Sequence, residues 1–525
     1  MATFDAKSQA VRPIVWSIAA SDSGGGAGIQ ADSLTINDLG GHACNIVTAI
    51  TAQNSLGVKD MVATSVAILA QQVNCLLEDM PPKAIKIGVL ANAQQVRWLS
   101  QWLSETFANY QQQLQVSIPI IWDPVMLATT GQSLTDKDAP PLLADYLHLA
   151  KQVSLLTPNA QELRYLLNAD VAVEHTEQWW LWLEILAHSI RSNVLLTGGG
   201  MQQGYAVDWM MVHDIAYSSE QHQHQIVGFK SAAINTPHQH GTGCTFSSAI
   251  ATVLALDYPM LDAVCVAKAY VNQGLLAGYK VGQGAGVLAR NGWPHTLSFF
   301  PTITLPHVAL LHTHQPLDFA PVTTPLNIYP VTQSLGVLKQ VLEAGARTVQ
   351  LRVKSTTNQW ELEQQIKEAV ALGTQFQAQV FINDHWQLAV KYGAFGVHLG
   401  QEDLLQADLK CIANAGLALG LSSHGYFELL IAQQLHPSYL ALGHIFATPT
   451  KTMPSQAQGL IKLKRYCQLL SGKLPLVAIG GINADNLAQV KRTGIGDVAI
   501  VRAIEQAPCP ASSWQYLQQQ WEMQA

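Results

Sequence analysis

The stretch FINDHWQLAVKYGAFGVHLGQED, residues 381–403, carries the side chains with the most readable chemistry. Two short apolar strands within it are each followed by an acid, Asp384 after the first strand and Asp403 after the second. The carboxyl ends of parallel strands meet at one face of a βα fold, so these carboxylates can share a hard cation such as Mg²⁺. Basic and hydroxyl residues follow in two more segments, TVQLRVK at 348–354 and ATPTK at 447–451. The combination predicts a site for Mg²⁺ and a polyphosphate.

A second group of reactive residues lies in the first half, where HGTGCTFSSAIA occupies residues 240–251. The turn Gly241-Thr242-Gly243 leads directly into a helical stretch, which aims backbone N–H groups and the positive end of the helix dipole at one point. This arrangement predicts an anion-binding turn. Cys244 stands at the start of the helix, where we expect a lowered thiol pKa that favours the thiolate. The alternative is a buried cysteine that only packs a tight helix start.

A glycine-rich loop, SDSGGGAGIQAD at 21–32, follows the first apolar strand of the chain. Its glycines allow the backbone to approach a ligand closely, and Asp32 lies one turn inside the helix that follows. By itself, a loop of this kind does not identify its ligand.

The composition limits the classes of protein to which the chain can belong. Its 525 residues exceed what one hydrophobic core can hold and predict two or three domains. With 48% hydrophobic and 12% charged residues, these domains can fold, and no part is expected to be disordered. A net charge of −7 argues against a nucleic-acid partner and against a polybasic membrane-binding surface.

The same composition indicates a compartment. The seven cysteines are scattered without a CxxC pair, which is typical of a reducing environment. A transmembrane helix needs about 18 uninterrupted apolar residues, and no segment approaches that length. The first residues lack the pattern of a secretory leader. We therefore expect a soluble cytoplasmic enzyme with no membrane partner.

The order of the elements predicts two α/β domains. Along the first half, apolar strands alternate with helical stretches, as in an α/β sheet with crossover helices, and a hairpin-like region follows at 205–230. The segment 291–325 is rich in proline, histidine and threonine, and we interpret it as a partly packed linker between a domain at 1–290 and a domain at 326–525. The second domain is expected to form a compact (β/α)₈ barrel. Its strands are expected at 326–331, 349–353, 380–383, 397–399, 417–422, 440–445, 476–479 and 498–501.

Five segments of the second half occur in an order that resembles thiamine-phosphate synthase: QLRVK, FINDHWQLAVKYGAFGVHLGQEDL, GLSSH, ALGHIFATPTKTMPS and VAIGGI. That family joins a hydroxymethylpyrimidine diphosphate to a thiazole phosphate on a TIM barrel. The resemblance, which covers 326–504, implies Mg²⁺ at Asp384 and Asp403. It implies that the pyrimidine diphosphate is bound by Gln350, Arg352, Lys354, Asn383, Ser422 and Lys451. It implies that the thiazole phosphate is bound by Thr448, Thr450, Gly481, Val501 and Arg502.

The first half resembles the hydroxymethylpyrimidine/phosphomethylpyrimidine kinases of the ribokinase fold. The segments that carry this resemblance, between residues 14 and 286, are SDSGGGAGIQAD, TAQNSLGV, KIGVL, WDPVMLATTG, TPNAQEL and HGTGCT. The resemblance implies an N-terminal ribokinase-like α/β sandwich that uses ATP and Mg²⁺. A cysteine at the end of the anion turn, where sugar kinases of this fold have an aspartate, favours a hydroxymethylpyrimidine over a sugar.

The kinase resemblance also implies a role for each of several side chains. Gly241, Gly243 and Cys244 would be catalytic, Asp32 and Gln53 would bind the aminopyrimidine edge, Val89 and Val125 would flank the ring, and Asn159 and Glu162 would organise Mg²⁺ through water. The histidines that punctuate the barrel strand ends are interpreted as structural hydrogen-bonders, because the synthase chemistry needs no imidazole base: His385, His398, His424 and His444.

Several positions depart from these families. Thr197 stands where the kinases usually have a lysine that reaches the transferring phosphate, and Pro237–Gln239 lengthen the approach to the anion turn. Loss of that cation is expected to slow phosphoryl transfer unless a neighbour, His238 or His240, replaces it. Arg502 stands where the synthases commonly have serine.

Together the halves predict a bifunctional enzyme of thiamine biosynthesis. The first domain would phosphorylate a hydroxymethylpyrimidine twice with ATP, and the second would condense the diphosphate with thiazole phosphate. The alternative is an active synthase that carries a catalytically weakened pyrimidine-binding kinase module. The expected partners are these small-molecule substrates, and a homodimer through the kinase domain is a further expectation.

Overall fold

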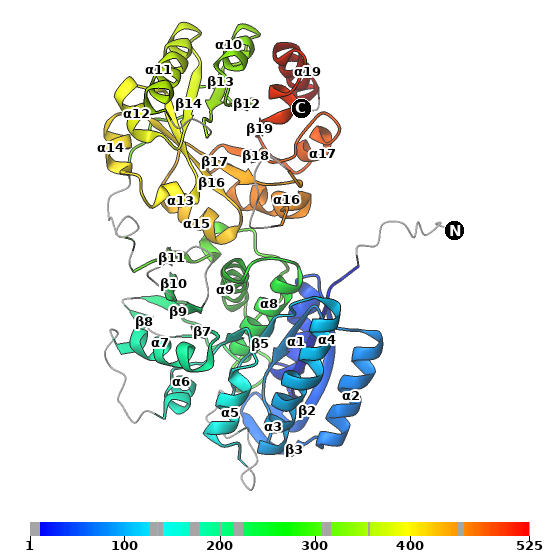
Figure 1. Cartoon of the computed structure of the whole chain (residues 1–525). Helices are drawn as coiled ribbons and strands as arrows, with labels where there is room; N and C mark the ends of the chain where they lie inside the picture. The colour runs from blue at the N-terminus through cyan, green and yellow to red at the C-terminus, as the bar shows by residue number, and fades with distance from the viewer. Residues whose placement is uncertain are drawn as a thin grey trace. The chain divides into compact units, whose positions relative to one another are not determined.

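The computed structural model of the chain describes residues 11–126, 134, 140–168, 178–198, 201–202, 204–213, 224–306, 308, 317–354, 358–448 and 456–523. The chain divides into two compact units, Met1–His307 and Val308–Ala525 (Figure 1). Within the described ranges, no helix combines the length and the apolar character that a membrane crossing requires.

The first unit contains a mixed sheet of eleven strands among its described residues, in the order β11-β10-β9-β7-β6-β5-β4-β1-β2-β3, with β8 paired to β9. The strands from β7 to β2 in this order are parallel, whereas β3 at one edge and β8 to β11 at the other are antiparallel. Their bounds are β1 Ile14–Ser21, β2 His42–Asn54, β3 Gly57–Ala63, β4 Ala84–Ile87, β5 Ile120–Trp122, β6 Leu155–Leu156, β7 Asn193–Leu196, β8 Met201–Gln202, β9 Tyr205–His213, β10 His224–Ala232 and β11 Thr302–Thr304.

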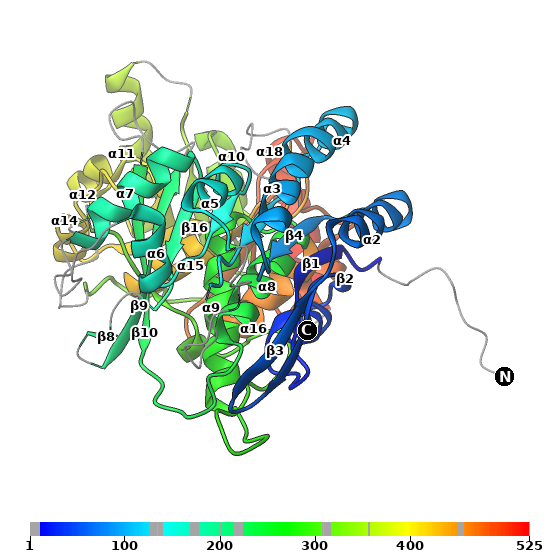
Figure 2. The ribbon, with the colours of Figure 1, turned by 90° about the horizontal axis from the view of Figure 1, so that it is seen from below.

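Helices cover both faces of this sheet (Figure 2). The helices of one face pack on one another: α1 Gly28–Asp38, α8 Thr242–Ala255 and α9 Met260–Leu276. The other face carries α2 Val66–Asp79, α3 Ala93–Trp102, α4 Ala108–Leu114, α5 Leu143–Ala150, α6 Ala160–Leu167 and α7 Gln178–Ile190. The apolar run IVWSIAAS of β1 is buried except at its two ends, as expected for a parallel strand with helices on both sides.

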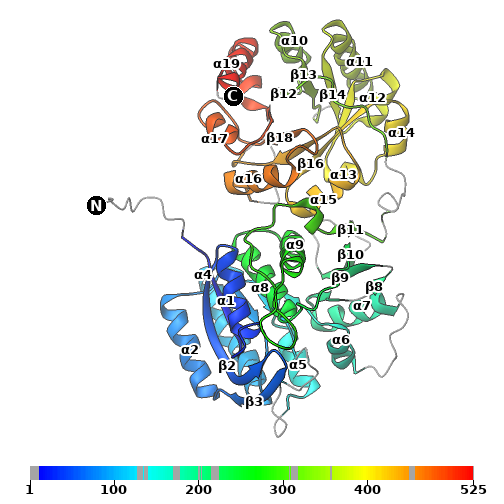
Figure 3. The same cartoon turned by 180° about the vertical axis from the view of Figure 1, so that it is seen from behind.

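The second unit is a closed barrel of eight parallel strands with helices around it (Figure 3). The strands are β12 Ile328–Thr332, β13 Thr348–Leu351, β14 Gln379–Asn383, β15 Gly396–Leu399, β16 Ala418–Ser423, β17 Tyr439–Gly443, β18 Leu476–Ile479 and β19 Asp497–Ile500. The helices are α10 Leu335–Glu343, α11 Gln359–Gln375, α12 Trp386–Tyr392, α13 Gln401–Leu404, α14 Leu409–Asn414, α15 Tyr426–Gln434, α16 Gly459–Leu470, α17 Leu487–Lys491, α18 Arg502–Glu505 and α19 Pro510–Glu522. The predicted TIM barrel is confirmed, and each predicted strand overlaps an observed one.

The barrel interior is filled by buried side chains from several of its strands. Three aromatic rings meet there, with centroids of Phe381 and Tyr439 5.1 Å apart and those of Tyr329 and Tyr439 5.9 Å apart. All three rings are fully or almost fully buried. The barrel is therefore a packed core, and its ligands must bind at one end of the strands.

The segment predicted as a linker, 291–325, belongs largely to the two units. Strand β11 pairs antiparallel with β10 and completes one edge of the first sheet. Further along, the N–H of Ala320 donates to the carbonyl oxygen of Leu417, and the N–H of Thr323 donates to the side chain of Gln379. The composition of the segment obscured these contacts, because short edge pairings need no apolar periodicity.

Candidate active sites

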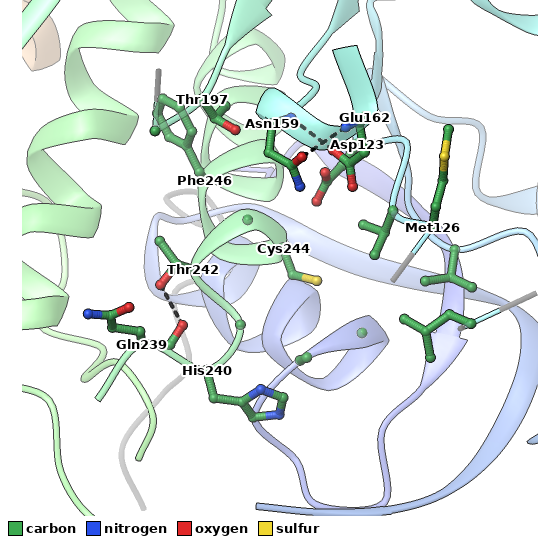
Figure 4. Close-up of a pocket in the computed structure, with 18 of the residues that line it drawn as sticks. Asp123, Met126, Asn159, Glu162, Thr197, Gln239, His240, Thr242, Cys244 and Phe246 are labelled. Atoms are coloured by element: carbon green, nitrogen blue, oxygen red, sulfur yellow. Dashed lines mark hydrogen bonds between the residues drawn. The ribbon is translucent and has the colours of Figure 1, made fainter. Parts of the chain in front are cut away.

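The first unit has a pocket of about 1200 Å³ at the carboxyl ends of its parallel strands (Figure 4). Its walls come from the ends of β1, β2, β4, β5, β6 and β7 and from α8 and α9. Ligands of open α/β sheets bind at this edge, so the position alone marks a substrate site. Most residues predicted for this half line the pocket: Gln53, Val89, Val125, Asn159, Glu162, Thr197, Gly241, Gly243 and Cys244.

The turn at 241–243 begins α8 in a geometry that suits an anion. Gly241 has a φ of +79°, and a Cβ at this position would collide with the carbonyl oxygen of Gly26. No side chain caps α8, but the N–H of Thr242 already donates to the carbonyl oxygen of Gln239 at 3.3 Å, so the N–H groups that follow in the first turn are the ones that can face a ligand. The hydroxyl of Thr242 donates to the carbonyl oxygen of Gln239 at 2.7 Å and fixes the turn to the preceding residues.

Asp22 ties the glycine-rich loop to the residue before this turn. One carboxylate oxygen accepts from the N–H groups of Gly26 at 3.1 Å and Ala27 at 2.8 Å. The same oxygen lies 3.0 Å from Nε2 of His240. Burial would raise the pKa of Asp22, but the bonds from His240 and from loop N–H groups outweigh it and lower the pKa. The side chain of His240 is therefore tied to the glycine-rich loop through Asp22.

A buried ion pair lies behind the pocket wall. Nζ of Lys86 lies 2.8 Å from the carboxylate of Asp32, and both side chains are fully buried. Asp32 also accepts from the hydroxyls of Ser17 and Ser248, each at 2.6 Å. Both of its oxygens thus have partners within the protein, and the contact of Asp32 with an aminopyrimidine edge stays a prediction. Asp32 holds Lys86, which does line the pocket.

The ionisation of Cys244 also differs from the expectation. Burial raises the pKa of this thiol to about 12, and the charges of Asp32 and Asp123 add to the rise while Lys86 opposes it. The predicted thiolate is therefore wrong for this structure. The helix N-terminus and one lysine do not compensate for burial beside two carboxylates.

Three polar side chains, those of Asn159, Glu162 and Asp123, gather at one wall of the pocket (Figure 4). Asn159 and Glu162 form a capping box at the start of α6, where Glu162 accepts from the N–H of Asn159 at 2.8 Å. Asp123 lies at the end of β5, and its Oδ2 is buried without a hydrogen-bond partner among the described residues. A Cβ at Gly243 would lie 3.2 Å from that oxygen, so Asp123 also borders the anion turn.

These two carboxyls are harder to ionise than usual. Burial raises the pKa of Glu162, and the charge of Asp123 raises it further. Burial also raises the pKa of Asp123, although the positive charge of Lys86 opposes the rise. Acids with raised pKa values in a cleft can bind a divalent cation or exchange protons near neutral pH.

Thr197 lies at the end of β7, close to a lysine that comes from another element. The hydroxyl of Thr197 donates to the carbonyl oxygen of Pro158 at 3.4 Å. The next residue, Gly198, donates its N–H to Asp208 at 2.8 Å, and the second oxygen of Asp208 lies 2.6 Å from Nζ of Lys268 on α9. Lys268 lines the pocket, so a cation is present near the position of the missing lysine.

The remaining wall of this pocket suits a small polar aromatic ring. Val89 and Val125 belong to one apolar cluster at the pocket wall. Gln53 lies beside them, and its backbone is fixed by two hydrogen bonds with the hydroxyl of Ser23, at 2.7 and 2.8 Å. Its amide can offer a donor and an acceptor to a ring nitrogen and an exocyclic amine.

The second candidate site lies at the carboxyl ends of the barrel strands. Asp384 follows β14 directly, with a φ of +64°, and its N–H donates to the carbonyl oxygen of His398 at 3.0 Å. Asp403 lies in α13, which follows β15, the strand next to β14. Nζ of Lys354 lies 3.6 Å from a carboxylate oxygen of Asp384. The two acids therefore follow neighbouring strands, with a cation beside them.

Further predicted ligands belong to the inner part of this mouth. Gln350 and Asn383 are buried strand residues, and Ser422 is half-buried at the end of β16. Burial lowers the pKa of Arg352, and the neighbouring carboxylates of Asp384 and Glu505 oppose this effect. Arg352 remains a cation next to two acids.

Two consecutive glycines after β18 form a loop that suits a phosphate. Gly480 has a φ of +102° and Gly481 a φ of +67°, and a Cβ at Gly481 would lie 2.7 Å from Cβ of Phe446. The neighbouring loop, at Val501 and Arg502, begins α18. Thr448 lies at the end of the described part of the loop after β17, whereas Thr450 and Lys451 lie outside the described residues.

Comparison with known proteins assigns both units. A sequence model of phosphomethylpyrimidine kinase matches residues 22–289, and a model of thiamine monophosphate synthase matches residues 321–504. The thiamine-phosphate synthase of Pectobacterium atrosepticum is 51% identical over 190 residues, which are 36% of this chain and 89% of that protein. The chain belongs to the phosphomethylpyrimidine kinase and thiamine-phosphate synthase families.

Other known proteins are also similar to parts of the chain. The thiamine-phosphate synthase of Citrobacter koseri is 50% identical over 194 residues, which are 37% of this chain and 90% of that protein. The solved structure of phosphomethylpyrimidine kinase from Clostridium difficile 630 is 27% identical, covers 49% of this chain and 98% of its own, and has a TM-score of 0.38. A pyrimidine kinase and a thiamine-phosphate synthase are therefore both present, which confirms the predicted pair of domains in thiamine biosynthesis.

Several residues of the kinase and synthase sites were not predicted from the sequence. Lys86 and Asp123 stand in the segments KIGVL and WDPVM at strand ends, so their position could have suggested a role. Asp22 stands in the glycine-rich loop and gave a similar signal. Tyr329 and Tyr439 of the synthase stand within apolar runs, where nothing separates a functional phenol from a core residue.

Proposed function

We propose that the kinase unit phosphorylates 4-amino-5-hydroxymethyl-2-methylpyrimidine and then its monophosphate with ATP. The synthase unit then condenses the diphosphate with thiazole phosphate, to give thiamine phosphate and pyrophosphate. The observation that carries this proposal is the presence of both families on one chain, because one consumes what the other makes.

In the kinase, we assign the N–H groups at the start of α8 to the transferring phosphoryl group. Phosphoryl transfer passes through a loose transition state, so positioning and charge neutralisation supply most of the acceleration. The glycine turn offers both, and Lys268 near Thr197 adds a cation from α9. Gln53, Val89 and Val125 would hold the pyrimidine so that its hydroxymethyl group faces this turn.

The proton of the hydroxymethyl group needs an acceptor as the bond to phosphorus forms. Cys244 has a thiol whose pKa burial raises to about 12, so it suits a neutral hydrogen-bond partner of the substrate better than a base. Asp123 has an unpartnered oxygen beside Gly243. We assign the proton to this carboxylate, because a base with a pKa raised towards neutrality is the more effective one.

Asn159 and Glu162 of the kinase are proposed to hold Mg²⁺ through water. The buried, partly protonated carboxyl of Glu162 beside Asp123 fits this role, since a divalent cation would relieve the repulsion between them. Mg²⁺ would neutralise charge on the nucleotide phosphates.

In the synthase, the C–O bond to pyrophosphate breaks and a C–N bond to the thiazole forms. The barrier is mainly charge separation, so Arg352 and Lys354 would stabilise the departing anion. Asp384 and Asp403 fit a Mg²⁺ ion that adds positive charge there, since both are carboxylates at neighbouring strand ends. The electron-rich aminopyrimidine stabilises the carbon cation until the thiazole nitrogen attacks it. The Gly480–Gly481 loop and Arg502 would hold the thiazole phosphate.

One incubation tests the whole proposal. The purified chain receives the free pyrimidine, ATP, thiazole phosphate and Mg²⁺, and the products are identified by mass. Thiamine phosphate and pyrophosphate are expected, with pyrimidine monophosphate and diphosphate as transient species. If the free pyrimidine were left unchanged, the kinase assignment would be contradicted. If the diphosphate formed but accumulated without condensing, the synthase assignment would be contradicted.

We further infer a cytoplasmic enzyme that forms a homodimer through its kinase unit. Ile50 on β2 and Val62 on β3 expose 63% and 67% of their surface, which supports an apolar contact at this edge of the sheet. Light scattering of the wild type and of a double variant, Ile50→Lys with Val62→Lys, tests the dimer.

A further inference from the structure

A row of buried polar side chains crosses the barrel core below the synthase mouth. Nε2 of Gln350 donates to the phenol oxygen of Tyr329 at 2.9 Å, and this oxygen lies 2.9 Å from that of Tyr439. The Tyr439 oxygen lies 2.7 Å from Nδ1 of His398, and Nε2 of His398 lies 2.8 Å from the hydroxyl of Ser422. The row therefore connects a side chain of β13 to one at the end of β16.

The donors and acceptors in this row can be assigned from one end. Tyr329 accepts from Gln350, and its own O–H has only Tyr439 as a partner among the described residues. A buried hydroxyl without an acceptor is costly, so Tyr329 donates to Tyr439. By the same reasoning Tyr439 donates to Nδ1 of His398, which must then be the bare nitrogen of the imidazole.

The assignment continues to the mouth of the barrel. A neutral imidazole with a bare Nδ1 carries its hydrogen on Nε2, so His398 donates to the oxygen of Ser422. The burial of His398 favours the neutral ring. Within the described residues, the Ser422 hydroxyl has no other hydrogen-bond partner, and its side chain is half-buried. Its own hydrogen is therefore free to be donated to a ligand.

We propose that Gln350, through Tyr329, Tyr439 and His398, fixes the Ser422 hydroxyl as a hydrogen-bond donor to the pyrimidine diphosphate. Tyr329, Tyr439 and His398 are then positioning residues of the synthase. The substrate atom that meets Ser422 must be an acceptor, such as a phosphate oxygen or a ring nitrogen. The inference rests on the proposed function of the barrel mouth and specifies how one of its ligands is oriented.

The direction in which the hydrogen bonds of this row are donated can be measured in the unaltered protein. The chain is labelled with ¹⁵N-histidine, and the signal of His398 is identified by its loss in His398→Gln. A hydrogen on Nε2 and a bare Nδ1 are expected. The opposite tautomer, or a ring with hydrogens on both nitrogens, would overturn the proposal.

A double-mutant cycle then tests whether the row acts through Ser422. Tyr439→Phe breaks the row and should lower kcat of the synthase about tenfold, in line with one lost hydrogen bond. In a Ser422→Ala background the same change should have almost no further effect, because the group that it positions is gone. Tyr466→Phe is the matched control, since Tyr466 is a buried phenol that donates to Gln458 at 3.1 Å outside the row.

The outcomes separate this inference from the proposed function. If Tyr439→Phe lowers kcat equally with and without Ser422, the row is only structural and the inference is wrong, although the synthase assignment stands. If the wild type makes no thiamine phosphate from purified diphosphate and thiazole phosphate, the proposed function of the mouth fails instead.

Discussion

Lys86 on β4 faces the carboxylate of Asp32 on α1 and contributes a positive charge near Cys244 on α8. The thiol is half-buried, and its pKa is nevertheless raised, because removal from water and the nearby carboxylates outweigh the lysine. Burial and two like charges outweigh one cation and a helix end. The chemistry of a single residue in this pocket is thus set by side chains from several elements.

The first prediction concerns the proton acceptor of the kinase. Cys244→Ser should keep at least about a tenth of the kinase rate, because a hydroxyl can replace a neutral thiol as a hydrogen-bond partner. Asp123→Asn should lower the rate by about 10²-fold or more, the usual contribution of a general base. Steady-state phosphorylation of both pyrimidine substrates measures the two effects. A Cys244→Ser enzyme as slow as Asp123→Asn would instead make the cysteine the base.

The second prediction concerns the paired acids of the barrel. Asp384→Ala or Asp403→Ala should lower thiamine phosphate formation by about 10²-fold or more, because each removes a charge that would hold the metal. Pyrimidine phosphorylation should remain unchanged, since the kinase pocket contains neither residue. Glu402→Gln is the control, because this acid is exposed in the same helical turn. Normal condensation of purified diphosphate by both alanine variants would rule out the metal site.

At the residue scale, the sequence predicts which side chains reach a site better than it predicts their hydrogen-bond partners and their pKa values. Asp384 and Asp403 could be found because Asp384 directly follows the apolar strand β14 and Asp403 stands in the first helical turn after the apolar strand β15. The partners of Asp32 could not, since Ser17, Lys86 and Ser248 stand far from it along the chain. A pKa depends on such partners and on burial, and a short sequence motif specifies neither of them.

The ends of the elements carry most of the function in both units. Asn159 and Glu162 satisfy the free N–H groups at the start of α6 and also line the kinase pocket. The start of α8 is left without a side-chain cap. One helix terminus is thus closed by the protein and the other remains available to an anion.

The third prediction concerns Glu162, which belongs to the capping box at the start of α6. Burial and Asp123 raise the pKa of Glu162 to about 8, whereas an unfolded glutamate has a pKa of about 4.3. Between these values the folded chain binds more protons than the unfolded chain, so this group lowers stability as the pH rises. Glu162→Gln keeps the acceptor for the N–H of Asn159 and removes the titration. Its Tm should exceed that of wild type by about 2–4 °C at alkaline pH, and the difference should shrink towards pH 5.

Calorimetry of both proteins across this pH range tests the third prediction. Glu184→Gln, which changes an exposed glutamate on α7, should leave Tm unchanged at every pH. Loss of stability in Glu162→Gln at alkaline pH would mean that its carboxylate is a net stabilising group. The kinase rate should fall in Glu162→Gln, because the proposed Mg²⁺ organiser is lost.

The predicted elements were most accurate where one physical pattern dominates. The eight barrel strands are short apolar runs between helical stretches, and all of them were found. The pattern failed at β11, because a three-residue edge strand, TIT, carries too few residues for any periodicity. Its pairing with β10 is a tertiary contact that the local sequence does not specify.

At the scale of the whole molecule, the chain consists of two compact units, each with its own site. Every residue that lines the kinase pocket precedes residue 276, and every described residue assigned to the synthase mouth follows residue 328. The diphosphate is therefore the link between the two reactions.

The last prediction tests this independence with two full-length variants. Gly241→Ala should inactivate the kinase, because a Cβ there collides with Gly26 and the φ of +79° disfavours alanine. Asp384→Ala should inactivate the synthase. Neither variant alone should convert free pyrimidine to thiamine phosphate. An equimolar mixture should do so, because the diphosphate released by one chain can enter the other.

The time course of this mixture carries further information. Each variant is first checked for its intact half-reaction, so that a failure of the mixture cannot come from unfolding. If the diphosphate diffuses freely, the mixture should show a lag while it accumulates, and wild type at the same site concentration should show the same lag. A mixture that stays inactive although both half-reactions are intact would mean that the intermediate passes only within one chain. The two units would then be coupled in a way that their separate sets of site residues do not require.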